Sequence, residues 1–481
     1  MSRAWAVVAS AGVVRLGLGF VASLVIARAL GAADFGVYAV LAATVGIVGA
    51  LAEGGLTEAA VLRIAEVWPK QPSRAAQATS PAAEPRPPAA ERPPRAAEAY
   101  APAAAGSVNP PRAVERAAPA AAVAAAAAER AAAFFWLRFA LAAVVAALGC
   151  LTAGFLAEHW LNAPADLLRW ALIGVVATAA SGAVSAVLQA TGAFGRMSSL
   201  TLVNAALTAL LALALIAVGQ LTLLTALIIL GIGTSLAAFA VGWRMLPPGF
   251  TLRCPSARTI RHEAEQLLRT GRWLWLASLF AMLTANAEVL LLNHWAALPV
   301  VGAYALALSL ATKADLVNHS LYTVLLPGMG TLRERHALTT YLKQSLVRGG
   351  LIAIALLALV PLAPLVMTLI YGAEFAAAIV FLQLLLGVMI FDVLLTPLLL
   401  LPLAYRRPRL LAAGDATRAI VLVLAALALI PLLGAYGAIV ARFASRVSGA
   451  LVVLTLLWSD RATLEVQHEK TAAITHERPA A

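Results

Sequence analysis

Seven charged side chains fall inside apolar stretches of this 481-residue chain, and they are the residues best placed to do chemistry. A charge at the centre of a membrane helix costs about 2.5–3.5 kcal/mol, so contact with lipid is unfavourable. We therefore expect these side chains to face one another or a water-filled cavity. The seven are Arg15, Glu288, Lys313, Asp315, Asp392, Arg442 and Arg446.

The basic members of this set suit an anionic ligand. Guanidinium groups make bidentate hydrogen bonds to phosphate oxygens, and these replace the hydrogen bonds that the phosphate made with water. Arg442 and Arg446 are four residues apart, so they share one face of a helix. We predict that Arg15, Lys313, Arg442 and Arg446 bind a diphosphate group.

The acidic members suit ion coupling. Glu288, Asp315 and Asp392, with His319 four residues after Asp315, are candidates to bind a proton or a sodium ion. The competing interpretation is that each charge pairs with a partner on a neighbouring helix and rigidifies the bundle. Charges nearer the predicted helix ends are expected at an interface or as caps: Glu53, Glu58, Asp415 and Arg418.

Other chemistry finds little support. Cys150 and Cys254 give neither a disulfide framework nor metal-ligand spacing, and no Walker A pattern, metal pair or nucleophile elbow occurs. We therefore expect no catalytic residue, no metal and no cofactor, and predict that the protein is not an enzyme. The net charge of +12 would suggest nucleic acid in a soluble protein, but the basic residues lie mainly between apolar stretches. No nucleic-acid partner is expected.

The elements that position these charges are predicted to be membrane helices. Hydrophobic residues make up 62% of the chain and charged residues 12%, with a mean hydropathy of +0.89, which no soluble core could hide. The apolar runs are continuous rather than alternating, so they predict helices and not barrel strands. We predict about twelve, at 5–28, 35–60, 133–157, 167–191, 197–218, 221–246, 273–295, 299–326, 345–371, 375–404, 410–433 and 435–458.

The basic residues between these helices predict the orientation. They concentrate in alternate loops and in the tail, and the other loops offer Arg28 and Arg169 and little else. By the positive-inside rule, both termini are cytoplasmic and the number of helices is even.

An internal repeat divides the predicted helices into two halves. Residues 27–40 and 293–306 both leave one apolar helix and enter the next as G-x-Y-A, so Gly36 and Tyr38 match Gly302 and Tyr304. An offset of six helices means that the halves run parallel. The expected organisation is 1–68 (N-lobe, helices 1–2), 69–133 (insert), 134–246 (N-lobe, helices 3–6), 247–272 (cytoplasmic connector), 273–458 (C-lobe, helices 7–12) and 459–481 (cytoplasmic tail).

The insert at 69–133 differs in kind from the rest. Twelve of the chain's 25 prolines lie between Pro69 and Pro119, among alanine, arginine and glutamate. This mixture predicts a disordered cytoplasmic segment, with helix in its Ala-rich end before Phe134. It is either a docking tether for a cytoplasmic partner or a tolerated loop insertion.

Three stretches resemble the polysaccharide-exporter branch of the multidrug/oligosaccharidyl-lipid/polysaccharide (MOP) exporter superfamily. The branch pattern R-x-L-G-x-x-x-F-G-x-Y-A is filled by residues 28–39. LQATGAFGRM at 188–197 is similar to the loop after helix 4, and YGAEFAAAIVFLQLL at 371–385 is similar to the entry to helix 10. The likeness covers nearly all of the chain except 69–133 and the residues after Trp458.

The resemblance implies a multi-pass flippase of the bacterial inner membrane. Its expected substrate is polyprenyl-diphosphate-linked oligosaccharide for polysaccharide or lipopolysaccharide biosynthesis, carried by alternating access between two six-helix lobes. It also implies a cationic central cavity, to which Arg15 is carried over by position, and contact with membrane lipids and polysaccharide-assembly partners. The insert departs from the family pattern, and twelve helices disfavour the lipid II flippase branch, which typically has fourteen.

Two other functions remain open. A drug or cation exporter of the same superfamily would share the architecture but prefer acidic residues in its cavity. A membrane-embedded oligosaccharide polymerase or glycosyltransferase would need a sizeable outer loop for its chemistry, and the predicted outer loops are short.

Overall fold

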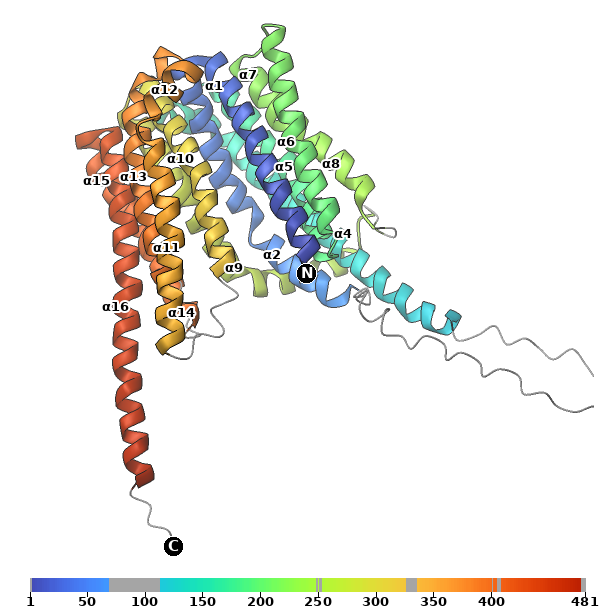
Figure 1. The fold of residues 1–481 in the computed structure, drawn as a ribbon. Helices are drawn as coiled ribbons and strands as arrows, with labels where there is room; N and C mark the ends of the chain where they lie inside the picture. The colour runs from blue at the N-terminus through green and yellow to red at the C-terminus, as the bar shows by residue number, and fades with distance from the viewer. Residues whose placement is uncertain are drawn as a thin grey trace, which may run out of the picture.

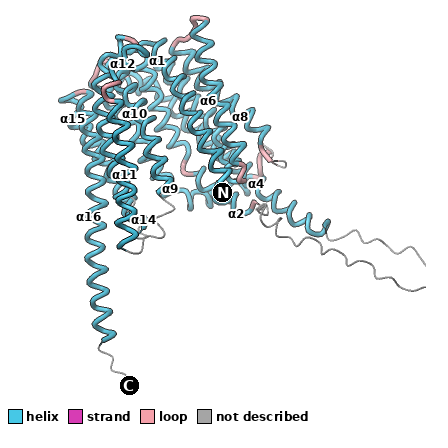
Figure 2. Tube along the Cα trace, in the orientation of Figure 1, coloured by secondary structure: helices cyan, strands magenta, loops and turns pink. Residues whose placement is uncertain are grey.

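The protein is described here by a computed structural model. It describes residues 2–68, 113–247, 250, 253–325, 335–399, 401–404 and 408–476. Within these ranges, side chains are described from residue 11 to residue 459. The exceptions, for which no side chain is described, are 113–124, 270, 314–339 and 403–408. Within these ranges the chain is helical apart from short turns (Figure 2), which agrees with the predicted all-α membrane protein.

The helices follow one another with short connections. They are α1 (Ser2–Glu53), α2 (Leu56–Val67), α4 (Ala113–Leu156), α5 (Ala165–Ala190), α6 (Phe194–Ala217), α7 (Leu223–Thr225), α8 (Thr234–Met245), α9 (Ala257–Trp295), α10 (Leu298–Leu325), α11 (Arg335–Leu359), α12 (Ala363–Val366), α13 (Ala376–Leu399), α14 (Leu401–Ala404), α15 (Pro408–Leu433) and α16 (Ala435–His476). Short wide turns of π-helix at Ala157–Leu161, Ala226–Gly233 and Met367–Tyr371, and a 3₁₀ turn at Ala373–Phe375, interrupt or extend them.

Ten helices among the described residues are long and apolar enough to cross a membrane. One of them, Ala11–Glu53, is 43 residues long and is broken at Gly31, whose φ of 72° and ψ of 174° are not helical. Figure 1 shows the chain reversing direction there, so α1 contains two antiparallel segments. The side chains of α10 are described only as far as Lys313, and the described part, Leu298–Lys313, is also apolar. The chain is a multi-pass membrane protein, and the count of twelve spans stays a prediction.

Both ends of the described chain lie on the same side of the bundle (Figure 1). We call this side, where α1 begins and α16 ends, the terminal face, and the other side the opposite face. The kink at Gly31 and the short connection between α9 and α10 lie on the opposite face, whereas α2 lies on the terminal face.

Helix α1 lies between the two halves of the molecule. It packs against α5 and α6 of the N-lobe and also against α9 and α10 of the C-lobe. Figure 1 shows α4–α8 on one side of α1 and α10–α16 on the other.

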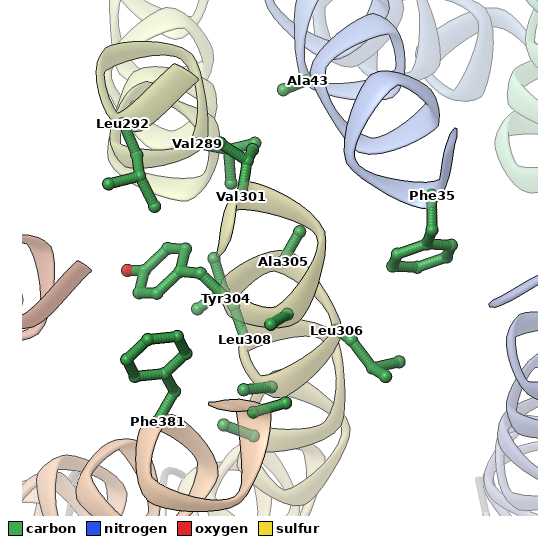
Figure 3. Close-up of a cluster of buried hydrophobic side chains, with 14 of the residues drawn as sticks. Phe35, Ala43, Val289, Leu292, Val301, Tyr304, Ala305, Leu306, Leu308 and Phe381 are labelled. Carbon is green, nitrogen blue, oxygen red and sulfur yellow. The ribbon is translucent and has the colours of Figure 1, made fainter. Parts of the chain in front are cut away.

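The largest buried cluster joins these interface helices. Figure 3 shows Phe35 of α1 on one side of α10, with Val289 and Leu292 of α9 and Phe381 of α13 around its other sides. The ring of Tyr304 meets that of Phe381 edge to face, 6.2 Å between centroids. Because lipid tails are as apolar as these side chains, close van der Waals packing holds the helices together.

Three helices extend beyond the predicted spans. Helix α4 begins at Ala113, so the last part of the predicted disordered insert is helical; residues 69–112 of the insert lie outside the described residues. Helix α9 begins at Ala257, inside the predicted connector, and α16 continues past Trp458 to His476. Hydropathy marks where a helix is apolar enough for lipid, and good helix formers such as alanine carry the helix further.

Candidate functional site between the two halves

The two matching glycines of the internal repeat face each other across the halves. A side chain on Gly36 would overlap the backbone of α10 at Leu298, and one on Gly302 would overlap the backbone of α1 at Ala32. Only glycine at both positions lets the two helices come this close. The two helices therefore make a close backbone contact here, on the opposite face.

The two family-like motifs at 28–39 and 371–385 also meet there. Arg28 donates a hydrogen bond from Nη1 to the carbonyl oxygen of Ile370 at 3.0 Å. The ring of Phe35 meets that of Phe375 edge to face, 6.1 Å between centroids. Gly31 leaves room for the carboxylate of Glu374, which would lie 2.8 Å from a Cβ atom at that position. The motifs thus join the N-lobe to the C-lobe and close the opposite face.

A second glycine contact joins the halves at the terminal face. Gly55, in the turn between α1 and α2, has a φ of 65° and packs against Gly271 of α9, where a side chain would meet backbone. Beside it, the indole Nε1 of Trp275 donates a hydrogen bond to the carbonyl oxygen of Ala50 at 3.2 Å. The halves therefore touch at both ends of their interface.

A cavity of about 440 Å³ lies next to this second contact. Its walls come from α1, α2, α4 and α5 of the N-lobe and from α9 of the C-lobe, so it is shared by the halves. Most of the lining is small or apolar, and the charged groups are Glu53, Glu58 and Arg138. We call it the interlobe cavity.

Arg138 is the cation of this cavity, and the sequence-based prediction missed it. Its Nη1 lies 3.2 Å from a carboxylate oxygen of Glu53 and also donates to the hydroxyl of Thr57. The Arg138 side chain is 12% exposed, and no described group accepts a hydrogen bond from its Nε. Gly182 of α5 makes room for the guanidinium, which would lie 2.7 Å from a Cβ atom there. A lone arginine inside the apolar run AAAFFWLRFALAAVV was the available signal.

Arg442 points instead into the C-lobe. Its Nη2 lies 2.9 Å from the carboxylate of Glu288 on α9, and its Nε donates to the same oxygen at 3.0 Å. The hydroxyl of Tyr304 also donates to this oxygen. Arg442 is 4% exposed and Glu288 is fully buried. The structure therefore brings one predicted substrate residue together with one predicted ion-coupling residue, as a buried ion pair.

Arg446 has a similar environment. Its Nη1 lies 2.7 Å from the carboxylate of Asp392 on α13. Arg418 of α15 lies 3.8 Å from the other oxygen of Asp392 and 3.6 Å from Asp415. Arg418 and Arg446 thus share the buried carboxylate of Asp392 inside the C-lobe, and Asp415 adds an exposed carboxylate beside Arg418.

Lys313 and Arg15 are placed differently. Lys313 is half-buried and donates to the hydroxyls of Ser309 on its own helix, at 2.9 Å, and of Ser23 on α1, at 3.1 Å. Arg15 is exposed on α1. Among the described residues no carboxylate pairs with either cation. Asp315 and His319 lie further along α10, where the side chains are outside the described residues.

Known proteins share this fold. A family model described as "Polysaccharide biosynthesis protein" matches residues 123–380. A multidrug resistance MATE family transporter of the MOP superfamily, solved in an inward-facing conformation, is 15% identical with a TM-score of 0.65, over 94% of this chain and 96% of that chain. The lipid II flippase MurJ in an inward closed conformation is 10% identical with a TM-score of 0.64, over 94% of this chain and 87% of that chain.

A search of curated proteins finds no significant match. At 15% and 10% identity, the solved structures establish the fold alone, which is the one that the resemblance predicted. The family model carries the family, because residues 123–380 are more than half of the 481-residue chain. The chain therefore belongs to the polysaccharide biosynthesis protein family.

Proposed function

We propose that the protein is a flippase that carries polyprenyl-diphosphate-linked oligosaccharide across the bacterial inner membrane by alternating access. The observation that carries this proposal is that the intramembrane cations fall into two groups. The C-lobe arginines Arg442 and Arg446 are neutralised by carboxylates, whereas Arg15 and Lys313 on the interface helices pair with no described carboxylate.

Cations on α1 and α10 that pair with no described carboxylate suit a diphosphate headgroup. An unpaired anion pays many kcal/mol to enter hydrocarbon, and positively charged donors replace the water it loses. Lys313 already contacts both halves through Ser309 and Ser23. Arg15 is eight residues before Ser23, or about 12 Å along an ideal helix, so α1 carries positive charge along the proposed path. The polyprenyl tail stays in lipid while the headgroup crosses.

Arg138 is proposed as a third contact for the headgroup. In the empty cavity its charge is balanced by Glu53, at 3.2 Å. Phosphate oxygens compete with a carboxylate for the same guanidinium donors, so a diphosphate entering the interlobe cavity would exchange with Glu53. Arg442 and Arg446 are then supports of the C-lobe rather than substrate contacts.

Ion coupling is proposed at Asp315 and His319. Glu288 and Asp392, the other two candidates, are held by Arg442 and Arg446 and would have to leave those partners to bind an ion. A coupled flippase slows when the proton and sodium gradients are collapsed, and a rate unaffected by collapse of both gradients would end this part of the proposal.

The terminal face is proposed to be cytoplasmic. The predicted alternation of basic loops places both termini on that side. Diphosphate-linked substrates would then enter near the interlobe cavity and leave past the Gly36–Gly302 contact.

A drug or cation exporter is the second candidate. The interlobe cavity favours it in one respect, because Glu53 and Glu58 outnumber Arg138 there. Such an exporter would lower the sensitivity of cells to cationic drugs and would not relieve the accumulation of lipid-linked glycan.

Complementation of a flippase-deficient strain tests the proposal, with lipid-linked glycan accumulation as the readout. Arg15→Ala and Lys313→Ala should each reduce flipping about tenfold or more, since hydrogen bonds to charged groups contribute roughly 1.5–3 kcal/mol. Arg169→Ala is the matched control, because Arg169 pairs with Asp166 on the protein surface. Full flipping by the Arg15→Ala, Lys313→Ala double variant at normal expression would overturn the assignment.

A further inference from the structure

A groove on the terminal face combines arginines with apolar walls. It has a volume of about 650 Å³ and lies between α9, the end of α1 and the middle of α4. Leu51, Leu141, Leu268 and Trp275 contribute apolar surface, and Arg269 and Arg272 contribute positive charge. It is separate from the interlobe cavity, with which it shares no lining residue.

The arginines lie where phosphate groups of a bilayer are found. Helix α9 begins at Ala257, and charged residues recur along it as far as Arg272, after which a long apolar run begins at Trp273. Arg269 and Arg272 thus lie just before the part of α9 that is apolar enough for hydrocarbon. Trp273 follows Arg272 directly, and its side chain is 69% exposed, as is typical of an aromatic residue at a membrane interface. The guanidinium of Arg272 lies 5.6 Å from the centre of the Trp273 ring.

The acidic residues of this part of α9 form ion pairs with arginines other than Arg269 and Arg272. Glu263, on the buried side of the helix, pairs with Arg63 at 3.2 Å and with Arg130 at 3.7 Å. Glu265, at the rim of the groove, pairs with Arg261 at 3.4 Å. Among the described residues no carboxylate pairs with Arg269 or Arg272, so the groove presents a net positive charge above apolar walls.

We propose that this groove binds one anionic phospholipid, whose phosphate contacts Arg269 and Arg272 and whose upper acyl chain lies against Leu141, Leu268 and Trp275. A basic pocket between membrane helices on one leaflet is the arrangement that recognises anionic headgroups. A volume of about 650 Å³ suits a headgroup with its glycerol backbone. The inference goes beyond the proposed transport function, since it concerns a lipid that stays bound.

Such a lipid would join the two halves. Its phosphate binds α9 of the C-lobe, and its chain packs on α9 and on Leu141 of α4 in the N-lobe, beside the Gly55–Gly271 contact. The bound lipid therefore favours the state in which the terminal face is closed at this place.

The test is native mass spectrometry of the full-length protein with phosphatidylglycerol, in parallel with thermal melting in nanodiscs of phosphatidylcholine with or without phosphatidylglycerol. The wild-type protein should retain one phosphatidylglycerol and melt at a higher temperature when it is present. Arg269→Gln with Arg272→Gln should weaken retention at least tenfold and abolish the rise in melting temperature. Arg253→Gln with Arg258→Gln removes the same charge from exposed sites outside the groove and should leave both readouts unchanged.

A second variant separates charge from shape. Leu51→Trp, at a half-exposed position, fills the groove without changing its charge and should also displace the lipid. Equal losses in the groove and control pairs would overturn the proposal in favour of unspecific attraction. Displacement of phosphatidylglycerol by inorganic phosphate would overturn it in favour of a free-anion site. Tighter binding of farnesyl diphosphate, lost in the groove pair, would assign the groove to the transported substrate instead.

Discussion

Single residues of the C-lobe interior are held together by buried charge pairs. Glu288 accepts from both Arg442 and Tyr304, and all three side chains are buried. In a low-dielectric interior, removing one partner of such a pair costs about 3–5 kcal/mol, because the other charge is left buried alone. Replacing both partners by apolar side chains avoids that cost.

This difference gives a prediction for the Arg442–Glu288 pair. Arg442→Leu should strongly lower the melting temperature in detergent, and adding Glu288→Leu should restore most of it. The double-mutant cycle measures the coupling directly. A double variant that melts normally but no longer flips substrate would contradict the purely structural role and return Arg442 to the transport path.

A second prediction at this scale concerns Glu53, which balances Arg138 at the interlobe cavity. Glu53→Gln removes the competing carboxylate, so a diphosphate-containing substrate analogue should bind more tightly, by up to about tenfold for a partly exposed pair. Turnover should fall because release becomes slower. Glu58→Gln, a carboxylate in the same cavity, is the control, and equal effects of the two variants on affinity would argue against exchange at Arg138.

At the scale of elements, α1 and α10 meet through glycine at equivalent positions of the repeat. Gly302→Ala inserts a methyl group into the backbone of α1 and should separate the helices, so the opposite face would open more readily and transport would fall. Increased labelling of a cysteine introduced at Phe35 would measure this opening. Gly387→Ala on α13, where nothing lies within 4 Å of an added Cβ, should change neither property. Unchanged labelling and transport in Gly302→Ala would show that the contact is not a gate.

At the scale of the whole molecule, labelling of one native cysteine can test the proposed orientation of the protein in the membrane. Cys254 is exposed between α8 and α9 on the terminal face. In a Cys150→Ala background, a membrane-impermeant maleimide should label Cys254 only after permeabilisation. A cysteine at Pro164, on the opposite face, should be labelled in intact cells. The reverse pattern would invert the orientation.

The sequence predicted an all-helical membrane protein, but it did not predict which residues pair with the intramembrane charges. The continuous apolar runs predicted membrane helices and the order of three motifs predicted the family, because these features are local in the chain. The two similar halves inferred from the G-x-Y-A repeat stay a prediction. Spacing also placed Arg442 and Arg446 on one helix face. Their partners Glu288 and Asp392 come from α9 and α13, and that choice depends on how distant helices pack, which no local pattern encodes. Arg138 was missed for the same reason, since Gly182 and Glu53 define its environment only after folding.

The touching glycines Gly36 and Gly302 also constrain how the two copies of the predicted repeat can evolve. A methyl group gained by either copy collides with the main chain of its twin, and main chain cannot move aside as a flexible side chain can. Neither copy can therefore drift alone at this point, however far the remaining residues diverge after a duplication. We expect paired retention of the smallest residue here to outlast most other traces of a common ancestor.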